Sequence, residues 1–469
     1  MRGSLTALAA TILAACGSNH TFPPPPSTDT TGAGAFLDTL QRRTFGYFWD
    51  LTNTANGLTP DRSPTPSFSS IAAVGFALTA YPIGVERGYV SRAAARDRVL
   101  ATLRFFWTAP QDSSASATGY HGFFYHFLDM TTGQRFQTVE LSTIDTALLL
   151  GGVLMCQSYF TDTDPAETEI RALAESIYTR ADWQWAQHHP PAIALGWHPE
   201  SGFIPYDWRG YNEAMLIYIL ALGSPTHPVG PDAWTAWTGT YSWGTFEGQT
   251  HLGFAPLFGH QYSHVWIDFR AIQDTYMRGH SLDYFENSRR ATYAQQAYGA
   301  ANPGGWTGYG AQVWGLTASD GPANTTLSIG GQTRQFHTYF ARGASFTEIQ
   351  DDGTIAPTAA GASVAFAPEL AIPALLTMRR TYGTNLFSTY GFLDAFNPTF
   401  RGTPQQGRVD PQAGWFDTDY LGIDQGPILA MLENYRTGLV WRVMRGNPHI
   451  VTGLCRAGFT GGWLTGRCP

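Results

Sequence analysis

The chain has 469 residues and a net charge of −8 at pH 7, and all 28 of its basic residues are arginine. A nucleic-acid-binding surface needs clustered positive charge, and no such cluster is visible, so this class of partner is excluded. Hydrophobic residues make up 43% and aromatic residues 14% of the chain. That aromatic surplus fits either a large core or a cleft in which sugar faces stack on rings.

The first residues have the pattern of a targeting segment. Arg2 is followed by a short apolar stretch at 5–13, which is too short to span a bilayer, and by small residues leading to Cys16. The ending "LAAC" resembles the lipobox of bacterial lipoproteins. This predicts a signal peptide at 1–16, a lipidated Cys16 and a place in the bacterial cell envelope, periplasmic or associated with the outer membrane. An ordinary secretory signal with an incidental Cys16 is the alternative.

Composition divides the rest of the chain into three parts. Residues 17–35 are rich in Pro and Gly and predict a flexible tether, and residues 36–450 contain no further linker. Residues 451–469 predict a Gly-rich C-terminal tail. Because an exported protein can form disulfides, Cys455 and Cys468 in or beside this tail are a possible pair.

Two kinds of helical pattern alternate along residues 36–450. One kind is amphipathic, with Arg on its polar face: 36–52, 91–107, 166–187, 231–239, 280–299 and 386–396. The other kind is apolar nearly all round: 69–81, 143–158, 212–222, 263–276, 365–380 and 425–437. An amphipathic helix covers a surface, whereas an all-apolar helix is buried on every side. The alternation predicts an all-α fold, an (α/α)6 barrel with six inner and six outer helices. A helical solenoid is the alternative.

Long loops rich in Trp and Tyr separate these helices. They span 108–140, 188–210, 238–262, 302–362 and 397–423. Loops of this length are uncommon unless they build a site. Because the inner helices of such a barrel run parallel, their N-termini converge on one rim. We therefore expect an aromatic-walled cleft at that rim.

Four carboxylates stand at or just before the starts of apolar helices, and each has a structural alternative. Glu140 and Asp145 precede or open one helix, Glu213 a second and Asp424 a third. Asp145 completes an S-x-x-D capping box that starts at Ser142. Glu213 could complement a helix dipole, and Asp424 could occupy a first helical turn. Capping explains each residue singly but does not require aromatic loops around all of them.

The functional alternative for these carboxylates is glycoside hydrolysis. The reaction needs one carboxyl group as an acid and a second as a base or nucleophile. Glu213, followed by an apolar run, suits an acid that stays protonated through burial. Asp424, near Asp417 and Asp419 in what we expect to be a wetter loop, suits an ionised base. No motif demands a metal or a cofactor, although the acidic loop 417–424 could hold an incidental cation.

The rim loops also supply candidates for contact with a sugar. The predicted substrate-binding residues are Tyr206, Trp208, Trp243, His260, Gln261, Tyr262, Arg270 and Trp415. Packing is an equal alternative for His260, Gln261 and Tyr262. Arg270 lies close to Asp268, and a structural ion pair is the alternative there, because a buried charge must be paired.

Several long motifs resemble the bacterial glucoamylase-like domain, a group that includes glycoside hydrolase family 144. They are "LQRRTFGYFWD", "SIAAVGFALTAYPIGVERGYVSR", "ELSTIDTALLLGG", "GWHPESGFIPYDWRGYNEAMLIYILALGSP", "PLFGHQYSHVWIDFRAIQD" and "DYFENSRRATYAQQ". The resemblance covers 36–450 and implies an (α/α)6 barrel that hydrolyses β-1,2-glucan, in endo mode and with inversion, to sophorose and short oligomers. It implies Glu213 as general acid and Asp424 as base, with Glu140 and Asp145 beside them.

Other functions on the same fold stay open. An exo-acting, sophorose-releasing hydrolase or a β-glucan transglycosylase could use the same site, and a non-catalytic glycan-binding lipoprotein could use the same cleft. A polysaccharide lyase would need Arg or Lys beside Tyr and His, which the acidic rim does not favour. We expect a monomer whose partner is a poly- or oligosaccharide, with membrane contact only through the lipid anchor.

Overall fold

The structure, a computed structural model, describes residues 32–468. The predicted signal peptide, its Cys16 and most of the tether lie outside the described residues. The first helix, α1 (Ala33–Leu51), starts three residues before the predicted boundary at 36. Within 32–468, no helix combines the length and the apolarity that crossing a membrane would require.

Six helices form the inner ring. They are α2 (Ile71–Glu86), α4 (Thr143–Tyr159), α6 (Met215–Gly223), α8 (Tyr262–Trp266), α11 (Pro357–Gly361) and α13 (Gly422–Arg436). Helices α2 and α4 touch backbone to backbone, because a Cβ at Gly75 would lie 2.2 Å from the carbonyl oxygen of Leu148, and one at Gly152 would lie 2.1 Å from that of Gly75. Helix α13 packs against α2, α8 and α11, which continues the ring.

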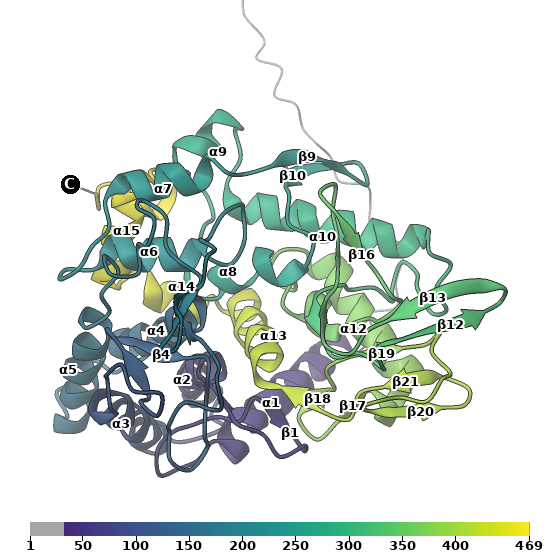
Figure 1. The fold of residues 1–469 in the computed structure, drawn as a ribbon, viewed down its shortest axis with the longest axis horizontal. Coiled ribbons are helices and arrows are strands. Elements are labelled where there is room, and N and C mark those ends of the chain that lie inside the picture. Colours follow the sequence, from purple (N-terminus) through teal and green to yellow (C-terminus); the bar gives the residue numbers. More distant parts are fainter. Residues whose placement is uncertain (1–31, 469) are drawn as a thin grey trace, which may run out of the picture.

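Six helices cover this ring. They are α1, α3 (Arg92–Thr108), α5 (Pro165–Thr179), α7 (Pro231–Thr238), α10 (Tyr284–Ala301) and α12 (Pro368–Tyr382). In Figure 1, α13 lies near the centre of the molecule, with α3 and α5 at one margin and α12 towards the other. The predicted (α/α)6 barrel is therefore confirmed.

The fifth helix pair differs from its prediction. The short α11 takes the inner place, and the apolar segment 365–380 forms most of the outer helix α12, which has Arg379 and Arg380 in its last turn. Segment 386–396, predicted as an outer helix, forms instead the hairpin of β17 (Phe387–Ser388) and β18 (Gly391–Phe392). Helix α11 has five residues, mostly small, and is too short to show a helical period. The pattern therefore predicts the apolar segment of α12 in its place.

Two further elements are shorter than predicted. The inner helix expected over 263–276 ends at Trp266, and a separate short helix, α9 (Thr275–Gly279), follows. The outer helix expected over 166–187 ends at Thr179.

The C-terminal part is more ordered than a tail. Helix α14 (Leu439–Met444) precedes α15 (Pro448–Arg456), which crosses the predicted boundary at 450 and packs against α6. A Cβ at Gly453 of α15 would lie 2.1 Å from the carbonyl oxygen of Ile219, so this packing is close. Cys455 and Cys468 form a disulfide that joins α15 to the end of the chain.

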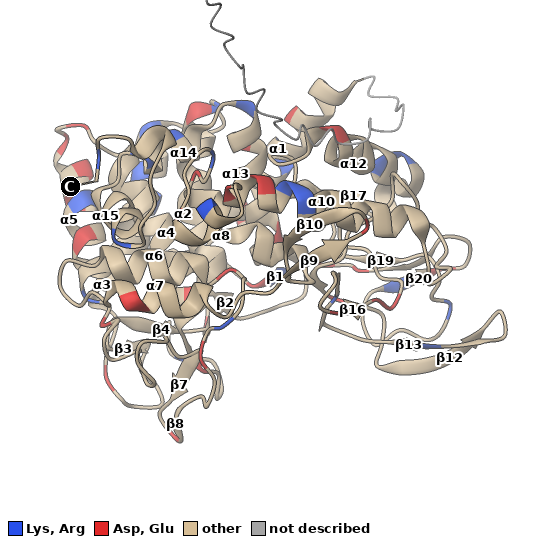
Figure 2. Cartoon of the chain, turned by 90° about the horizontal axis from the view of Figure 1, so that it is seen from above, with Lys and Arg blue, Asp and Glu red and all other residues tan. Residues whose placement is uncertain are grey.

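The rim loops fold into short antiparallel strand pairs, most of which lie on one side of the helices in separate groups (Figure 2). One sheet contains β3 (Gly119–Tyr120), β4 (Phe123–Tyr125), β6 (Leu141–Ser142), β7 (Gly196–His198) and β8 (Gly202–Phe203). The other strands are β9 (Trp243–Phe246) with β10 (Gln249–Leu252), β11 (Ala318–Ser319) with β14 (Phe340–Ala341), β12 (Thr325–Ile329) with β13 (Gln332–Phe336), β15 (Gly343–Ala344) with β16 (Ile349–Gln350), and β19 (Phe396–Asn397), β20 (Arg408–Asp410) and β21 (Gly414–Phe416).

Three inner helices begin directly after a two-residue strand. Strand β2 (Ser69–Ser70) leads into α2, β6 into α4 and β22 (Tyr420–Leu421) into α13. Strand β2 pairs with β5 (Phe127–Leu128), and β22 pairs with β1 (Arg62–Ser63). These pairings bring residues near 61 and 126 to the helix N-termini, where the predicted carboxylates stand.

Candidate active site

A cavity of about 340 Å³ opens at the N-terminal ends of α2 and α13. It is lined by Asp61, Arg62, Phe68, Ser70, His126, Phe127, Tyr339, Leu421 and Ile423. The rings of Phe68 and Phe127 lie 4.1 Å apart and form an aromatic wall. A larger hollow, about 540 Å³, lies over the outer helix α1, where Arg42, Trp49 and Tyr390 line it. The cavity at the rim is the one beside the carboxylates.

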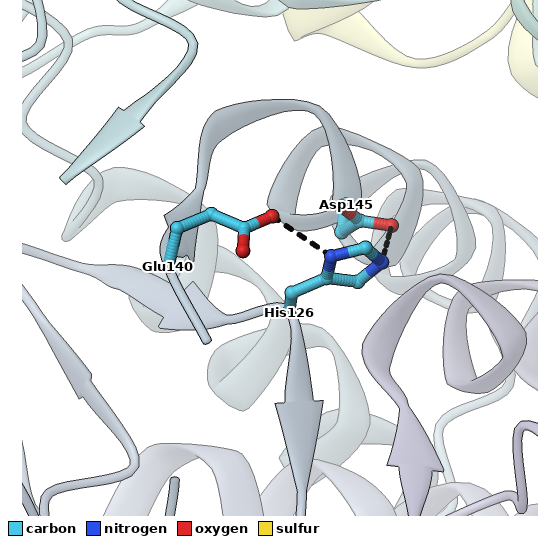
Figure 3. Close-up of side chains that lie close together, drawn as sticks. All are labelled: His126, Glu140 and Asp145. Carbon is cyan, nitrogen blue, oxygen red and sulfur yellow. Dashed lines mark hydrogen bonds and ion pairs between the residues drawn. The ribbon is translucent and has the colours of Figure 1, made fainter. Parts of the chain in front are cut away.

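One group of polar residues at the rim, which we call the His126 group, consists of His126, Glu140 and Asp145 (Figure 3). The imidazole lies between the two acids: Nδ1 is 2.8 Å from Glu140 Oε1, and Nε2 is 3.5 Å from Asp145 Oδ1. Burial opposes protonation of His126, but the negative charges of Asp145 and Glu140 prevail and raise its pKa to about 9. Burial works against ionisation of Glu140 too, yet the contact with His126 leaves the pKa of Glu140 lowered.

Asp145 takes part in a helix cap and also faces His126. The Ser142 hydroxyl oxygen caps α4 by accepting the Asp145 N–H at 3.1 Å, and this hydroxyl donates to Asp145 Oδ2 at 2.5 Å. The capping alternative therefore holds for Ser142, whereas the Asp145 carboxylate bonds the serine hydroxyl and the imidazole. Burial raises the pKa of Asp145.

Glu213 lies just before α6 and is 9% exposed. Among residues 32–468, no hydrogen-bond partner reaches its Oε2, which is buried. Burial raises the pKa of Glu213 to about 7, and the charge of Asp145 adds to the rise. Its backbone carbonyl accepts the Ser263 hydroxyl at 2.9 Å, so the main chain is fixed while Oε2 has no partner among the described residues. The N-cap residue of α6 is Ala214, so Glu213 does not occupy the capping position.

Asp424 is the third residue of α13 and is 4% exposed. Burial and the negative charges of Asp320 and Asp61 raise its pKa, and its carboxyl lies within hydrogen-bond distance of Asp394. Two carboxylates this close cannot both be ionised without a compensating positive charge. The expectation that Asp424 stands in a wetter loop than Glu213 is wrong, and Asp417 and Asp419 nearby are buried as well.

Several residues at this rim were not predicted as part of the site. Arg62 lies 3.1 Å from Asp61 Oδ2 and 2.7 Å from Asp320 Oδ2, so it links two acids from distant loops. The N–H of Asp320 donates to Asp394 Oδ2 at 2.7 Å. Asp394 was not predicted because the sequence pattern places its segment, 386–396, in an outer helix. His126 lies in the aromatic loop 108–140. Glu140 stands two residues before the S-x-x-D box that starts at Ser142, and this acid could have suggested a basic partner such as His126.

Of the predicted sugar-binding residues, Tyr262 lies near both Glu213 and Asp424. It is buried, and burial together with the charges of Asp424 and Glu213 raises its pKa, which places it near both carboxyl groups. Tyr206 is 68% exposed on the loop that leads towards α6. Trp208 donates its indole N–H to Thr143 Oγ1 at 2.9 Å and so anchors the start of α4.

Two polar residues near Tyr262 are occupied by packing contacts. His260 is buried, and its Nε2 lies 3.1 Å from the carbonyl oxygen of Phe254. Gln261 donates to the carbonyl oxygen of Ala359 at 2.9 Å and to Ser363 Oγ at 2.8 Å, which ties the start of α8 to α11. For these two residues the structure favours the packing alternative.

Three further predicted residues are engaged in stacking, ion-pair or packing contacts. Trp243 stacks on His280, with ring centroids 4.1 Å apart. Arg270 bonds Asp268 at 2.8 Å, beside Arg445 of the C-terminal part, as the ion-pair alternative had it. Trp415 has no exposed surface and donates to the Gln406 carbonyl oxygen at 2.7 Å. A side chain buried in this way cannot stack on a sugar, so the surplus of aromatic residues is partly core.

The barrel and its rim carboxylates define a protein of the glucoamylase-like class. The profile of the family described as "Putative glucoamylase" matches residues 205–448, more than half of the chain. A "putative glucoamylase" from Bacteroides uniformis of known structure is 31% identical, with a TM-score of 0.78 over 92% of this chain and 98% of that one. The chain belongs to this family.

Two relatives carry more specific names. An exo beta-1,2-glucooligosaccharide sophorohydrolase (non-reducing end) from Parabacteroides distasonis is 29% identical over 89% of this chain, and the chain spans 57% of the length of that relative. The solved endo-beta-1,2-glucanase from Chitinophaga pinensis, in complex with sophorotriose and glucose, is 27% identical. Its TM-score is 0.78 over 92% of this chain and 99% of that one.

Proposed function

We propose that this protein is a glycoside hydrolase that cleaves β-1,2-glucan, with Glu213 as its general acid and Asp424 as its base. The observation that carries the proposal is the Glu213 carboxyl, which is buried, has an Oε2 without a hydrogen-bond partner among the described residues and has a pKa raised to about 7. A carboxyl group in that state can hold a proton near neutral pH and can donate it to a substrate oxygen. The names of the two relatives support the substrate.

The proposed reaction uses the two carboxyl groups on opposite sides of the glycosidic bond. Glu213 donates its proton to the oxygen of the leaving sugar as that bond breaks. Asp424 takes a proton from the water that attacks the anomeric carbon from the other face, and the configuration is therefore inverted. Asp145 supports the acid because its charge raises the pKa of Glu213.

Substrate contacts follow from the walls of the rim cavity. Phe68 and Phe127 offer ring surface, and Arg62, Asp61 and His126 offer polar groups for sugar hydroxyls. Tyr339 comes from the long loop 302–362 and is 54% exposed at the edge of this cavity, so it is placed to stack on a bound chain. We propose endo action that yields sophorose and short oligomers, by a protein anchored to the cell envelope through Cys16.

The proposal is tested by incubating the protein with linear β-1,2-glucan and, in parallel, with β-1,3-glucan and starch, and by resolving the products by size over time. A series of β-1,2-linked oligomers from the first substrate alone is expected. Sophorose as the sole early product would replace endo with exo action, and products longer than the substrate would indicate transglycosylation. Binding of β-1,2-glucan without any product would contradict the enzymatic proposal.

A further inference from the structure

Behind Asp424 lies a second group of acids, which we call the aspartate group: Asp320, Asp394 and Asp417. Each offers a carboxylate oxygen, and these oxygens lie within 4.8 Å of one another. The three side chains are 1–2% exposed. They come from three different rim segments, after β11, between β18 and β19, and after β21.

The hydrogen bonds of this group leave oxygens without a donor. Asp417 Oδ1 accepts the N–H groups of Thr418 and Asp419 at 2.6 and 3.3 Å, whereas Oδ2 receives no hydrogen bond from any residue in the described part of the chain. Asp394 Oδ2 accepts the Asp320 N–H, its Oδ1 receives no hydrogen bond from an N–H group within 32–468, and its carboxyl faces that of Asp424. A buried carboxylate oxygen in this state lacks the partner that its burial requires.

The arginines near the aspartate group are too few to pair with all of its acids, because each is shared with another carboxylate. Arg62 is ion-paired with Asp320, but it also serves Asp61. Arg342 reaches the backbone oxygen of Asp320, but its guanidinium is held by Asp352 at 2.6 Å. Asp424 and Asp419 add further buried acids next to the group. Among residues 32–468, several buried carboxyl groups thus share one guanidinium, so they cannot all be ionised without a further positive charge.

We propose that Asp320, Asp394 and Asp417 bind a divalent cation of the size of Ca²⁺. The ligands are all carboxylate oxygens, which a hard cation prefers. Ca²⁺ binds oxygen at about 2.3–2.6 Å, so ligands up to about 5 Å apart can share one ion. Mg²⁺ binds at about 2.0–2.1 Å and would require the three oxygens to draw closer together. No sequence motif demands this ion, although an incidental cation in the loop 417–424, which contains Asp417, was left open.

Within the described residues, the His126 group is the other place where three possible ligand side chains converge, and it carries no such proposal. There the imidazole already supplies the positive charge, and its two nitrogens face Glu140 and Asp145. In the aspartate group, the bound cation would supply the positive charge that the His126 imidazolium supplies in the His126 group. It would also tie three rim segments together behind Asp424.

The test uses the full chain, freed of metal with a chelator and then titrated with CaCl2 by calorimetry, with MgCl2 as the comparison. Wild type is expected to bind one Ca²⁺ per chain, more tightly than Mg²⁺, and to show a higher Tm with Ca²⁺. The variant Asp417→Asn keeps the amide oxygen that accepts the two backbone N–H groups, so it is expected to fold. Its affinity for Ca²⁺ is expected to fall at least tenfold. Asp410→Asn, a half-buried position at the end of β20, is the matched control and is expected to bind as wild type does.

The Tm without metal gives a second readout with the opposite sign. Removing one charge from an uncompensated group is expected to make Asp417→Asn more stable than wild type in chelator, and Ca²⁺ is expected to reverse that order. The proposal is overturned if wild type neither binds Ca²⁺ nor shifts in Tm. It is equally overturned if Asp417→Asn and Asp394→Asn both bind with wild-type affinity, since the ion would then occupy another place.

Discussion

The two acidic groups at the rim hold their negative charge in different ways. In the His126 group, an imidazole lies between Glu140 and Asp145, with a pKa raised to about 9. In the aspartate group, Arg62 at the edge is the ion-paired guanidinium, and it is shared with Asp61. Each proposed catalytic carboxyl stands beside one group, Glu213 near Asp145 and Asp424 near Asp394. The difference teaches that the acids beside Glu213 are paired with an imidazole of the chain itself, whereas the acids beside Asp424 share one guanidinium among the described residues.

The largest effect is expected on the Asp424 side. Asp424→Asn removes the proposed base, and kcat on β-1,2-glucan is expected to fall by about 10²–10⁴-fold. Asp419→Asn is the control, because its side-chain oxygen can still accept the Thr65 N–H, which it now does at 2.9 Å. Steady-state kinetics of both variants would locate the base. Loss of activity in Asp419→Asn with full activity in Asp424→Asn would move this role to the neighbouring residue.

A smaller effect is expected from pH, and it reports on the Glu213 side. The protonated form of Glu213 is the active one, and its pKa is raised to about 7. We therefore expect kcat/KM to fall as the pH rises above about 7, by about tenfold per pH unit once Glu213 is ionised. A pH profile of initial rates measures this. Constant kcat/KM between pH 7 and 9 would contradict a general-acid role for Glu213.

A third effect tests the positive charge of the His126 imidazole. The pKa of His126 is raised to about 9, from a value of about 6.5 in the unfolded chain, so its charge stabilises the folded state fully below pH 6.5. That contribution is lost as the pH rises through 9. Wild type is expected to exceed His126→Gln in Tm at pH 6, and the difference is expected to shrink by pH 9.5. A difference that stays constant over this range would show that the imidazole is not charged.

The smallest effect on activity is expected at the opposite part of the barrel. Arg270→Met takes one partner from the buried Asp268, which keeps Arg445, and is expected to lower the free energy of unfolding by roughly 1–3 kcal/mol. Chemical denaturation measures that loss. The value of kcat is expected to stay at the wild-type level, because Arg270 packs against Trp441 and away from the rim acids. A fall in kcat without a loss of stability would return Arg270 to the substrate site.

Sequence periodicity predicted the helices that are long and uniform in character. Helices such as α2 and α4 are apolar over most of their length, and so they stand out from the outer helices. The same rule failed at α11, which has five residues of mostly small side chains. A helix of this length shows no apolar period, so the sequence pattern predicts the neighbouring apolar α12 as the inner helix.

The site was predictable where it coincides with helix starts. Glu140, Asp145, Glu213 and Asp424 all precede or open apolar helices, which the pattern of charge before an apolar run indicates. Asp61 and His126 reach the same place through β1–β22 and β2–β5, pairs of two-residue strands. Strands this short have no period to detect, so tertiary pairing alone reveals those residues. Aromatic content could not separate the cleft from the core, as the buried Trp415 shows.

The role of Glu213 can be tested most directly with two substrates that differ in their leaving group. Glu213→Gln and wild type would be compared on linear β-1,2-glucan and on a β-1,2-gluco-oligosaccharide carrying a nitrophenol, which departs without protonation. If Glu213 is the general acid, the variant is expected to lose about 10²–10⁴-fold in kcat/KM on the glucan and to lose far less on the activated substrate. Equal losses on both substrates, or full activity on the glucan with a lower Tm, would contradict that role.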